Sequence, residues 1–294
     1  MNFWGVYRER EHSPEREFDD AEILRLTGGR LADSGNLVDL FSPAELPSTA
    51  EENPDAIFVM CERRAILQQL QRWSKLGVIV INSPSAILNT YRERTLSLLG
   101  DAGISFPFSR IVSTADRVVP DETEFPAWVK RGDVHCVQSG DVVLARSRNE
   151  IERILAELHG RGIETAVVQQ HIPGDLIKFY GVVDPDRSRE DENWFRWFYH
   201  RDQVLAGFRF DESDLRASAC LAARSLDLEI FGGDAIVTAA GETWIIDINA
   251  WPSFALFRDE ASEQIAGHIL RRAARSETLL VRTGGSDDKK IPAR

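Results

Sequence analysis

Three residues near the end of the chain could hold a divalent metal ion. Asp234 lies in the run GGDAIV, Asp247 and Asn249 lie in the run WIIDINA, and the turn residues AAGE separate the two runs. Because side chains alternate along a strand, Asp247 and Asn249 share one face, while Ile246 and Ile248 point to the other. A hairpin through the turn sets Asp234 across from them. Two carboxylates and an amide oxygen suit Mg²⁺, although Asp and Asn also commonly mark strand ends and turns.

This arrangement has an energetic consequence. Two carboxylates at close range repel each other unless a cation lies between them. Asp247→Asn relieves this repulsion and is therefore expected to leave folding intact or slightly improved, whereas any turnover that depends on a metal at this site is expected to be nearly abolished.

Two further segments carry groups that could bind a nucleotide. Lys130 ends the apolar stretch FPAWVK, where its ammonium group could reach a phosphate as a point charge. The segment VVQQHIPGD runs from a strand into a turn, whose free backbone groups could read the edge of an adenine. Taken alone, each has a simpler interpretation: an exposed lysine at a strand end, and an ordinary strand and turn.

The elements that must position these groups begin with an open α/β unit. Residues 56–61 form an apolar run typical of a strand buried on both faces, and residues 78–81 form a second one. A helical stretch at 62–76 between them completes a βαβ pattern with parallel strands. Ser83 and Pro84 then open a helix expected to run to about residue 102. Residues 11–53, rich in charge and turn residues, give no clear element.

The rest of the chain reads as a small mixed domain followed by a second α/β domain. The small domain contains the β-like stretches FPAWVK and DVVLA, a helix at 148–160 and a strand at 166–170. The last part contains paired strands at 176–183 and 194–200, a helix at 212–226 and the final hairpin. Residues from 282 onward are polar and lack apolar periodicity, as expected of a mobile tail.

Composition excludes several classes of protein. The chain has 294 residues, with 35 Lys and Arg against 47 Asp and Glu and a formal charge of −12. This acidic balance disfavours broad nucleic-acid binding, which needs a basic surface. Three scattered cysteines suggest neither a disulfide framework nor a zinc motif. Without a signal-like start or an apolar run long enough for a membrane helix, the expected location is the cytoplasm.

Taken in order, these features resemble the ATP-grasp superfamily over about residues 78–267. The resemblance implies a helix opening with NSP that leads into a lid domain carrying a nucleotide-binding lysine, here Lys130. It also implies an adenine-binding hinge at a strand end, and metal ligands on the last two strands. The hinge would be Gln169, Gln170, His171 and Ile172, and the metal ligands would be Asp234, Asp247 and Asn249.

Two basic positions follow from the resemblance. Where the family often has a first nucleotide lysine, in the helix after NSP, this chain has Arg92 and Arg94. The spacing from Arg92 to Pro107 matches the family spacing, so Arg92 is the expected phosphate ligand and Arg94 a surface residue. Lys178 matches a place where the family keeps a basic residue near the phosphates. The residues expected to act in catalysis are Lys130, Arg92 and Lys178.

Two departures from the family pattern also matter. The loop after Lys130 lacks the several glycines that commonly cradle phosphates, so Arg131 or His135 is expected to take over that contact. The ending Asp-x-Asn is followed by Pro252 and Ser253, whereas many carboxylate ligases have Glu-x-Asn followed by Pro-Gly. In this respect the chain is similar to the inositol trisphosphate kinases of the superfamily.

The predicted fold class is α/β with the ATP-grasp arrangement. The expected parts are an N-terminal α/β domain at 1–83, a connecting helix at 84–105, a lid at 106–168, a C-terminal α+β domain at 169–281 and a tail at 282–294. The lid is expected to be the most mobile folded part when no nucleotide is bound.

The resemblance implies an enzyme that uses ATP and Mg²⁺. The first hypothesis is a ligase that activates a carboxylate as an acyl phosphate and joins it to an amine. The alternatives are a kinase acting on a hydroxyl of a small polyol or sugar-like acceptor, and a nucleotide-binding module without catalysis. The expected partner is a small-molecule or peptide acceptor, with neither nucleic acid nor a membrane, and assembly into a homodimer stays open.

Overall fold

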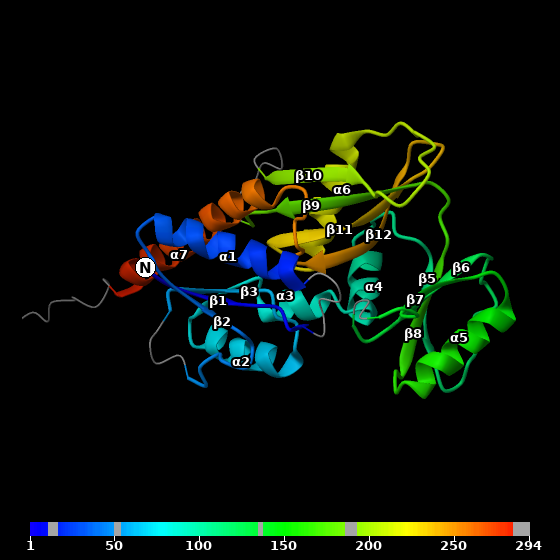
Figure 1. The fold of residues 1–294 in the computed structure, drawn as a ribbon, viewed down its shortest axis with the longest axis horizontal. Helices are drawn as coiled ribbons and strands as arrows, with labels where there is room; N and C mark the ends of the chain where they lie inside the picture. Colours follow the sequence, from blue (N-terminus) through cyan, green and yellow to red (C-terminus); the bar gives the residue numbers. More distant parts are fainter. Residues whose placement is uncertain (11–16, 50–53, 135–137, 186–192, 285–294) are drawn as a thin grey trace, which may run out of the picture.

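The computed structural model describes residues 1–10, 17–49, 54–134, 138–185 and 193–284. Within these residues the chain forms three four-stranded sheets and seven helices (Figure 1). The predicted mixed α/β class is therefore confirmed. Among the described residues, no helix combines the length and apolar character needed to cross a membrane.

The first sheet is parallel, with the strand order β2-β1-β3-β4. Its two inner strands are buried nearly throughout, which agrees with their uninterrupted apolar sequences. The strands are β1 (Asn2–Val6), β2 (Leu37–Phe41), β3 (Ala56–Val59) and β4 (Ile79–Ile81), and the helices of this unit are α1 (Glu17–Asp33) and α2 (Arg64–Lys75). The predicted βαβ pattern is confirmed in β3, α2 and β4.

The helix predicted from Ser83 to about residue 102 is two helices, α3 (Pro84–Asn89) and α4 (Arg92–Asp101). Ser83 caps α3 as predicted, because its Oγ accepts a hydrogen bond from the Ala86 amide at 3.1 Å. The helix is interrupted at Tyr91, whose backbone is extended. The Tyr91 hydroxyl donates a hydrogen bond to the Glu62 carbonyl at 2.7 Å. This contact with another segment is not readable from helical periodicity.

The second sheet and α5 (Arg148–Gly160) form a small body over the residues predicted as the lid, and this body is called the lid below. The sheet is antiparallel with the order β5-β8-β6-β7, and α5 has the predicted bounds. Its strands are β5 (Ser109–Ser113), β6 (Ala127–Arg131), β7 (Val142–Ala145) and β8 (Thr165–Gln170).

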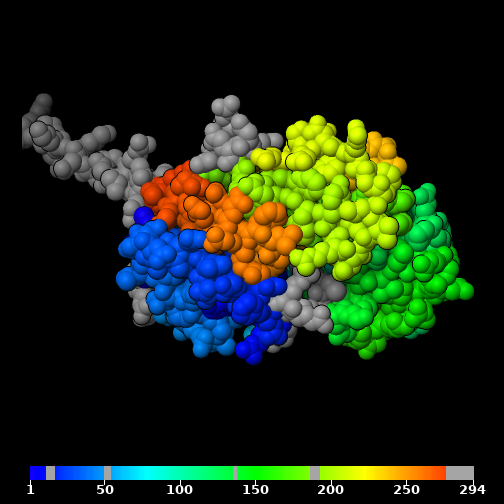
Figure 2. Space-filling model, turned by 45° about the horizontal axis from the view of Figure 1, so that its top comes forward, coloured from blue at the N-terminus to red at the C-terminus, as the bar shows by residue number. Residues whose placement is uncertain are grey.

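The third sheet is antiparallel with the order β10-β9-β11-β12, and α6 (Glu212–Ser225) packs on it. The predicted final hairpin is confirmed, because β11 and β12 pair on either side of the turn at 238–242. Its strands are β9 (Asp175–Val182), β10 (Trp194–Tyr199), β11 (Ile230–Val237) and β12 (Thr243–Ala250). The last helix, α7 (Arg258–Gly284), returns to pack against α1, as Figure 2 shows for the blue and orange segments.

The apolar cores connect the first and third sheets and leave the lid separate. One core joins side chains of β1 and β3, such as Trp4 and Ile57, to side chains of the third sheet, such as Phe179 and Phe231. A second core joins the other face of the first sheet to α1 and α7. The lid has its own core between its sheet and α5, built from residues such as Ile154. The lid is thus a separately packed body at one end of the molecule (Figure 1).

Candidate active site

Three charged residues stand in one row across the third sheet. In the strand register, Lys178 of β9 lies opposite Asp234 of β11, which lies opposite Asp247 of β12. The Lys178 Nζ atom lies 2.7 Å from Asp234 Oδ1, and both side chains are about one quarter exposed. Asn249 lies two residues further along β12, opposite Gly232. The hairpin therefore brings the three predicted metal ligands to neighbouring positions of one sheet.

A β-bulge changes the predicted alternation on β12. Asp234 pairs with Asp247, but Ala235 pairs with Ile245, so Ile246 is an extra residue without a partner on β11. The predicted strict alternation is therefore interrupted at Ile246, which lines the same small cavity as Asp247. Ile248, as predicted, is fully buried on the other side.

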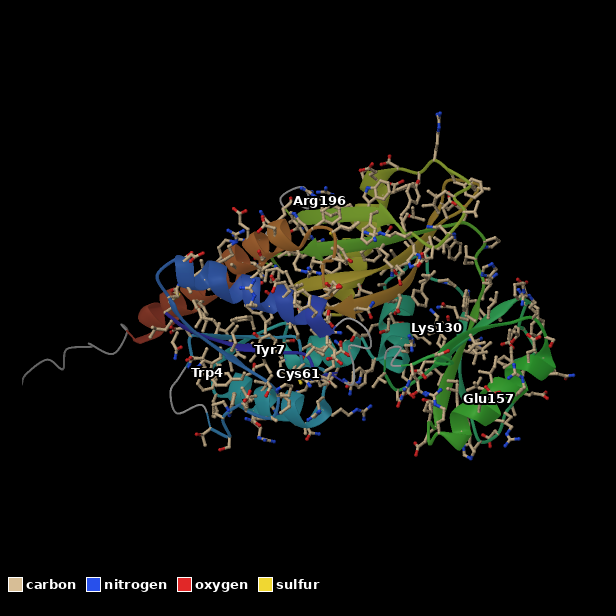
Figure 3. All side chains as sticks on the ribbon, viewed as in Figure 1. Trp4, Tyr7, Cys61, Lys130, Glu157 and Arg196 are labelled. Atoms are coloured by element: carbon tan, nitrogen blue, oxygen red, sulfur yellow. The ribbon has the colours of Figure 1, made fainter. Side chains whose placement is uncertain are left out.

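Lys130 reaches from the lid to this bulge. Lys130 is the penultimate residue of β6, and its Nζ donates a hydrogen bond to the Ile246 carbonyl at 3.2 Å. Lys130 is only 7% exposed. Burial lowers the pKa of the Lys130 ammonium to about 8, and the positive charge of Arg92 adds to this effect, while Asp247 and Asp234 oppose it. In Figure 3, Lys130 lies where the lid meets the rest of the molecule, whereas Glu157 lies on α5.

Arg92 connects the same point to the backbone of the lid. It is the first residue of α4 and is 6% exposed, whereas Arg94 is exposed on the surface. One guanidinium nitrogen donates hydrogen bonds to the carbonyls of Arg131 and Val134, each at 2.9 Å. The other terminal nitrogen lies 4.0 Å from Asp247 Oδ2. Arg92 thus occupies the predicted place, and its contact with phosphate stays a prediction.

Positively charged side chains surround the two carboxylates that were expected to repel each other. Lys130, Arg92 and Lys178 supply three positive charges beside the two carboxylates of Asp234 and Asp247. The carboxylates therefore already have cationic neighbours, which come from the lid, α4 and β9. The expectation that Asp247→Asn relieves a repulsion and improves folding does not fit this geometry.

The predicted hinge residues do not all face the site. Gln169 is 2% exposed and lines the small cavity with Arg92, Lys130 and Asp247. Its neighbour Gln170 points to the other face of β8, where its amide nitrogen lies 3.2 Å from a Glu124 oxygen.

The other predicted nucleotide-binding residues either do not line the cavity or lie outside the residues that the structure describes. The His171 ring accepts a hydrogen bond from the Trp128 indole at 3.2 Å, and desolvation lowers its pKa. Ile172 follows it, partly buried. His135 lies outside the described residues.

Sequence reasoning missed part of the cavity wall. Thr95, Leu96 and Phe106 line it, and no motif distinguishes them from ordinary helix and loop residues. The cavity volume is only about 10 Å³. Within the described ranges, no group of three or more His, Cys, Asp or Glu side chains is arranged to hold a metal. The expected Mg²⁺ set contains two carboxylates and one amide, so it stays a prediction.

Comparison with known proteins gives no match by sequence. No family model matches the chain, and no curated protein matches it.

Solved structures do match, over nearly the whole chain. A RimK domain ATP-grasp protein from Sphaerobacter thermophilus superposes with a TM-score of 0.65 at 18% identity, covering 91% of this chain and 99% of that protein. The D-alanine–D-alanine ligase from Bacillus anthracis, complexed with ATP, gives 0.67 at 12% identity, covering 94% and 98%. The ATP-grasp ligase PsnB, complexed with minimal precursor, Mg and ADP, gives 0.60 at 16% identity, covering 92% and 98%. This chain therefore has the ATP-grasp fold.

Proposed function

We propose that this protein is an ATP- and Mg²⁺-dependent ligase that activates a carboxylate as an acyl phosphate and joins it to an amine. One observation carries the proposal: Lys130 of the lid and Arg92 of α4 converge on Asp247 of the third sheet, in a chain with the ATP-grasp fold. The solved structures that resemble it include ligases described as complexes with ATP, or with Mg and ADP.

The oxygen ligands fit Mg²⁺. Asp234 and Asp247 pair directly across the hairpin, and their side chains are 24% and 23% exposed, so each remains accessible. Asn249 adds an amide oxygen on the same strand. Mg²⁺ prefers oxygen ligands and shares its remaining positions with water and phosphate. Mg²⁺ bound there would neutralise the negative charge that develops on the transferred phosphoryl group.

The protein side chains would bind and orient the phosphates. Lys130, Arg92 and Lys178 present three cations beside two carboxylates, which leaves an excess of one positive charge for an anionic ligand. Because the cavity is about 10 Å³, a nucleotide would enter only when the lid moves away from the third sheet. Because the lid has its own apolar core, such a movement would expose little buried apolar surface.

The proposed reaction has two steps, and in each of them one bond forms while another breaks. A carboxylate oxygen of the substrate attacks the γ-phosphorus of ATP, the bond to the β-phosphate oxygen breaks, and ADP leaves. The amine nitrogen then attacks the acyl carbon, phosphate departs with the acyl oxygen, and the nitrogen loses a proton. Neither step needs a nucleophile from the protein, so positioning and charge account for catalysis.

A kinase is the second candidate. The chain ends its metal motif with Asp-x-Asn and follows it with Pro252 and Ser253, in place of Glu-x-Asn and Pro-Gly. A kinase would place a hydroxyl oxygen where the ligase places a carboxylate oxygen.

The test is a screen of carboxylates, amines and polyols for ADP release, with mass spectrometry of the products. ADP, free phosphate and an amide indicate the ligase, whereas ADP with a phosphorylated alcohol indicates the kinase. Arg92→Ala serves as a site variant and Arg94→Ala as its matched surface control. ATP that binds without any turnover, and with the same affinity in Asp247→Ala, contradicts both enzymatic functions.

A further inference from the structure

The strand that carries two of the candidate metal ligands ends in a sharp change of direction. Trp251 directly follows β12, and its amide donates a hydrogen bond to the Ile230 carbonyl at 3.1 Å. Its φ of 38° lies in the left-handed region that bulky side chains rarely adopt. The indole ring is fully buried and stacks on Phe58 of β3, with 6.1 Å between the ring centroids. This conformation comes only two residues after Asn249, and contacts with other elements must hold it.

Arg8 supplies such contacts from the first sheet. Its Nη2 atom donates hydrogen bonds to the carbonyls of Ala250 and Trp251 at 3.1 and 2.8 Å. These carbonyls belong to the two residues that directly follow Asn249 in the chain. Because the guanidinium group is planar and rigid, the two bonds together fix the position and the orientation of this backbone.

Arg8 is itself held by carboxylates. Its Nη1 atom lies 3.1 Å from Glu62 Oε1, and its Nε atom lies 3.6 Å from Asp20 Oδ2. The side chains of Arg8 and Glu62 are only 12% and 2% exposed. Tyr7 and Cys61, which directly precede these two residues in the chain, are labelled in Figure 3. A buried ion pair contributes little net stability because both charges lose their hydration, so its value here lies in the position that it imposes on Arg8.

The backbone of Glu62 is a fixed anchor for this ion pair. Its amide donates to both carboxylate oxygens of Glu9 at 3.2 and 3.1 Å, and its carbonyl accepts the hydroxyl of Tyr91 at 2.7 Å. Tyr91 directly precedes Arg92, the expected phosphate ligand. The same anchor therefore holds the end of β12 through Arg8 and the start of α4 through Tyr91.

We propose that Arg8 is a positioning residue for the metal centre, because its hold on the two carbonyls after Asn249 keeps the Asn249 amide beside the two carboxylates. The role rests on the proposed ligase function, in which Asn249 binds Mg²⁺. Arg8 acts through Asn249 and contacts neither the metal nor a substrate. Replacing a group that orients a metal ligand typically lowers metal affinity by about 10- to 100-fold.

Arg8→Lys tests this role in the full-length protein. Lysine keeps the positive charge beside Glu62, but its ammonium group lacks the planar fork that reaches the carbonyls and the carboxylate together. The probe is Mn²⁺, titrated by electron paramagnetic resonance in the presence of a saturating non-hydrolysable ATP analogue. The Kd for Mn²⁺ is expected to rise about tenfold, whereas the Kd for the analogue without metal should not change. Arg153→Lys, exposed on α5, is the matched control and should bind both like wild type.

A second substitution shows whether Arg8 acts through Asn249. Asn249→Ala removes the amide oxygen and should weaken Mn²⁺ binding by itself. If Arg8 positions this amide, Arg8→Lys should have no further effect in the Asn249→Ala background. Fully additive losses would mean that Arg8 acts by another route, and they overturn the assignment.

The two carboxylates beside Arg8 provide a test that leaves Arg8 in place, and it decides the matter if Arg8→Lys does not fold. Glu62→Gln removes the charge at 3.1 Å and should weaken Mn²⁺ binding while leaving metal-free binding of the analogue unchanged. Asp20→Asn removes the charge at 3.6 Å, which makes the longer contact, and should bind Mn²⁺ like wild type. Equal losses in the two variants contradict an anchor at Glu62.

The remaining outcomes separate this role from the proposed function. Unchanged Mn²⁺ affinity in Arg8→Lys overturns the role even if ADP release proves a ligase. Parallel weakening of Mn²⁺ binding and of metal-free analogue binding, with a lower free energy of unfolding in urea, identifies Arg8 as a structural residue instead. A wild type that binds the analogue but no Mn²⁺ overturns the metal site of the proposed ligase, and this role with it.

Discussion

Replacement of Lys130 by methionine should stabilise the protein while weakening its binding of ATP. Methionine keeps a similar shape without the charge, so it removes the burial penalty of the ammonium group. A purely structural lysine would show the opposite effect on stability, which makes the sign of the change informative.

The magnitude follows from the pKa. A decrease from 10.5 to about 8 corresponds to a cost of about 3 kcal/mol for the buried charge at neutral pH. The variant also loses the hydrogen bond to the Ile246 carbonyl, which offsets about 1 kcal/mol. The net expected gain is about 2 kcal/mol in the free energy of unfolding at pH 7.

The gain should shrink as the pH rises. Between pH 8 and 10.5 the unfolded chain holds the Lys130 proton and the folded protein does not. The wild type therefore becomes more stable with pH in this window, whereas the variant lacks this contribution. Urea unfolding at several pH values, without nucleotide or metal, measures the difference, and Lys75→Met on the exposed end of α2 is the control.

ATP affinity provides the second measurement. Loss of one charged contact with phosphate should raise the Kd for ATP by about 10- to 100-fold. In the wild type, ATP affinity should fall as the pH rises through 8, and the variant should lack this dependence. A variant that unfolds more easily than wild type at pH 7, or that binds ATP equally well, refutes the role assigned to Lys130.

Three further expectations concern the same site. Arg92→Ala should weaken ATP binding while Arg94→Ala should not, and the reverse pattern in equilibrium titrations would exchange the two roles. Hydrogen exchange across the lid, residues 106–168, should slow when ATP and Mg²⁺ are added, and equal protection in both states would count against closure. Asp247→Asn should nearly abolish ADP release and lower the free energy of unfolding by about 1–2 kcal/mol in the absence of metal.

Local patterns were sufficient for much of the fold. The apolar runs that became β3 and β4, the helix α5 and the final hairpin depend on periodicity and turn residues within short windows. The sequence of α1 gave no comparable signal, because Gly28 and Gly29 interrupt its helical pattern. Gly28 is explained by packing: a Cβ atom there would lie 3.2 Å from a Leu40 side-chain carbon on β2. Such a contact is visible only in three dimensions.

In the site too, the features set within one strand or hairpin could be predicted from the sequence, whereas contacts between distant elements could not. The alternation that pairs Asp247 with Asn249 is a property of one strand, and the register with Asp234 follows from the hairpin. The bulge at Ile246 is not encoded by any motif, yet it leaves the carbonyl that Lys130 contacts. The cations arrive from three other elements, so their distances to the carboxylates could not be read from spacing.

The positions of these cations reverse the expected effect of Asp247→Asn on stability. If the two carboxylates stood alone, removing the charge of Asp247 would relieve their repulsion and favour folding. Instead Arg92 lies 4.0 Å from Asp247 and is buried, and the nearly buried Lys130 is stabilised in its charged form by the same carboxylate. Asp247→Asn removes the carboxylate that offsets the repulsion between these two cations. The free energy of unfolding in the absence of metal therefore decreases. Double substitution decides the matter: Lys130→Met combined with Asp247→Asn should recover most of the lost stability, whereas additive losses would show that the two charges do not interact.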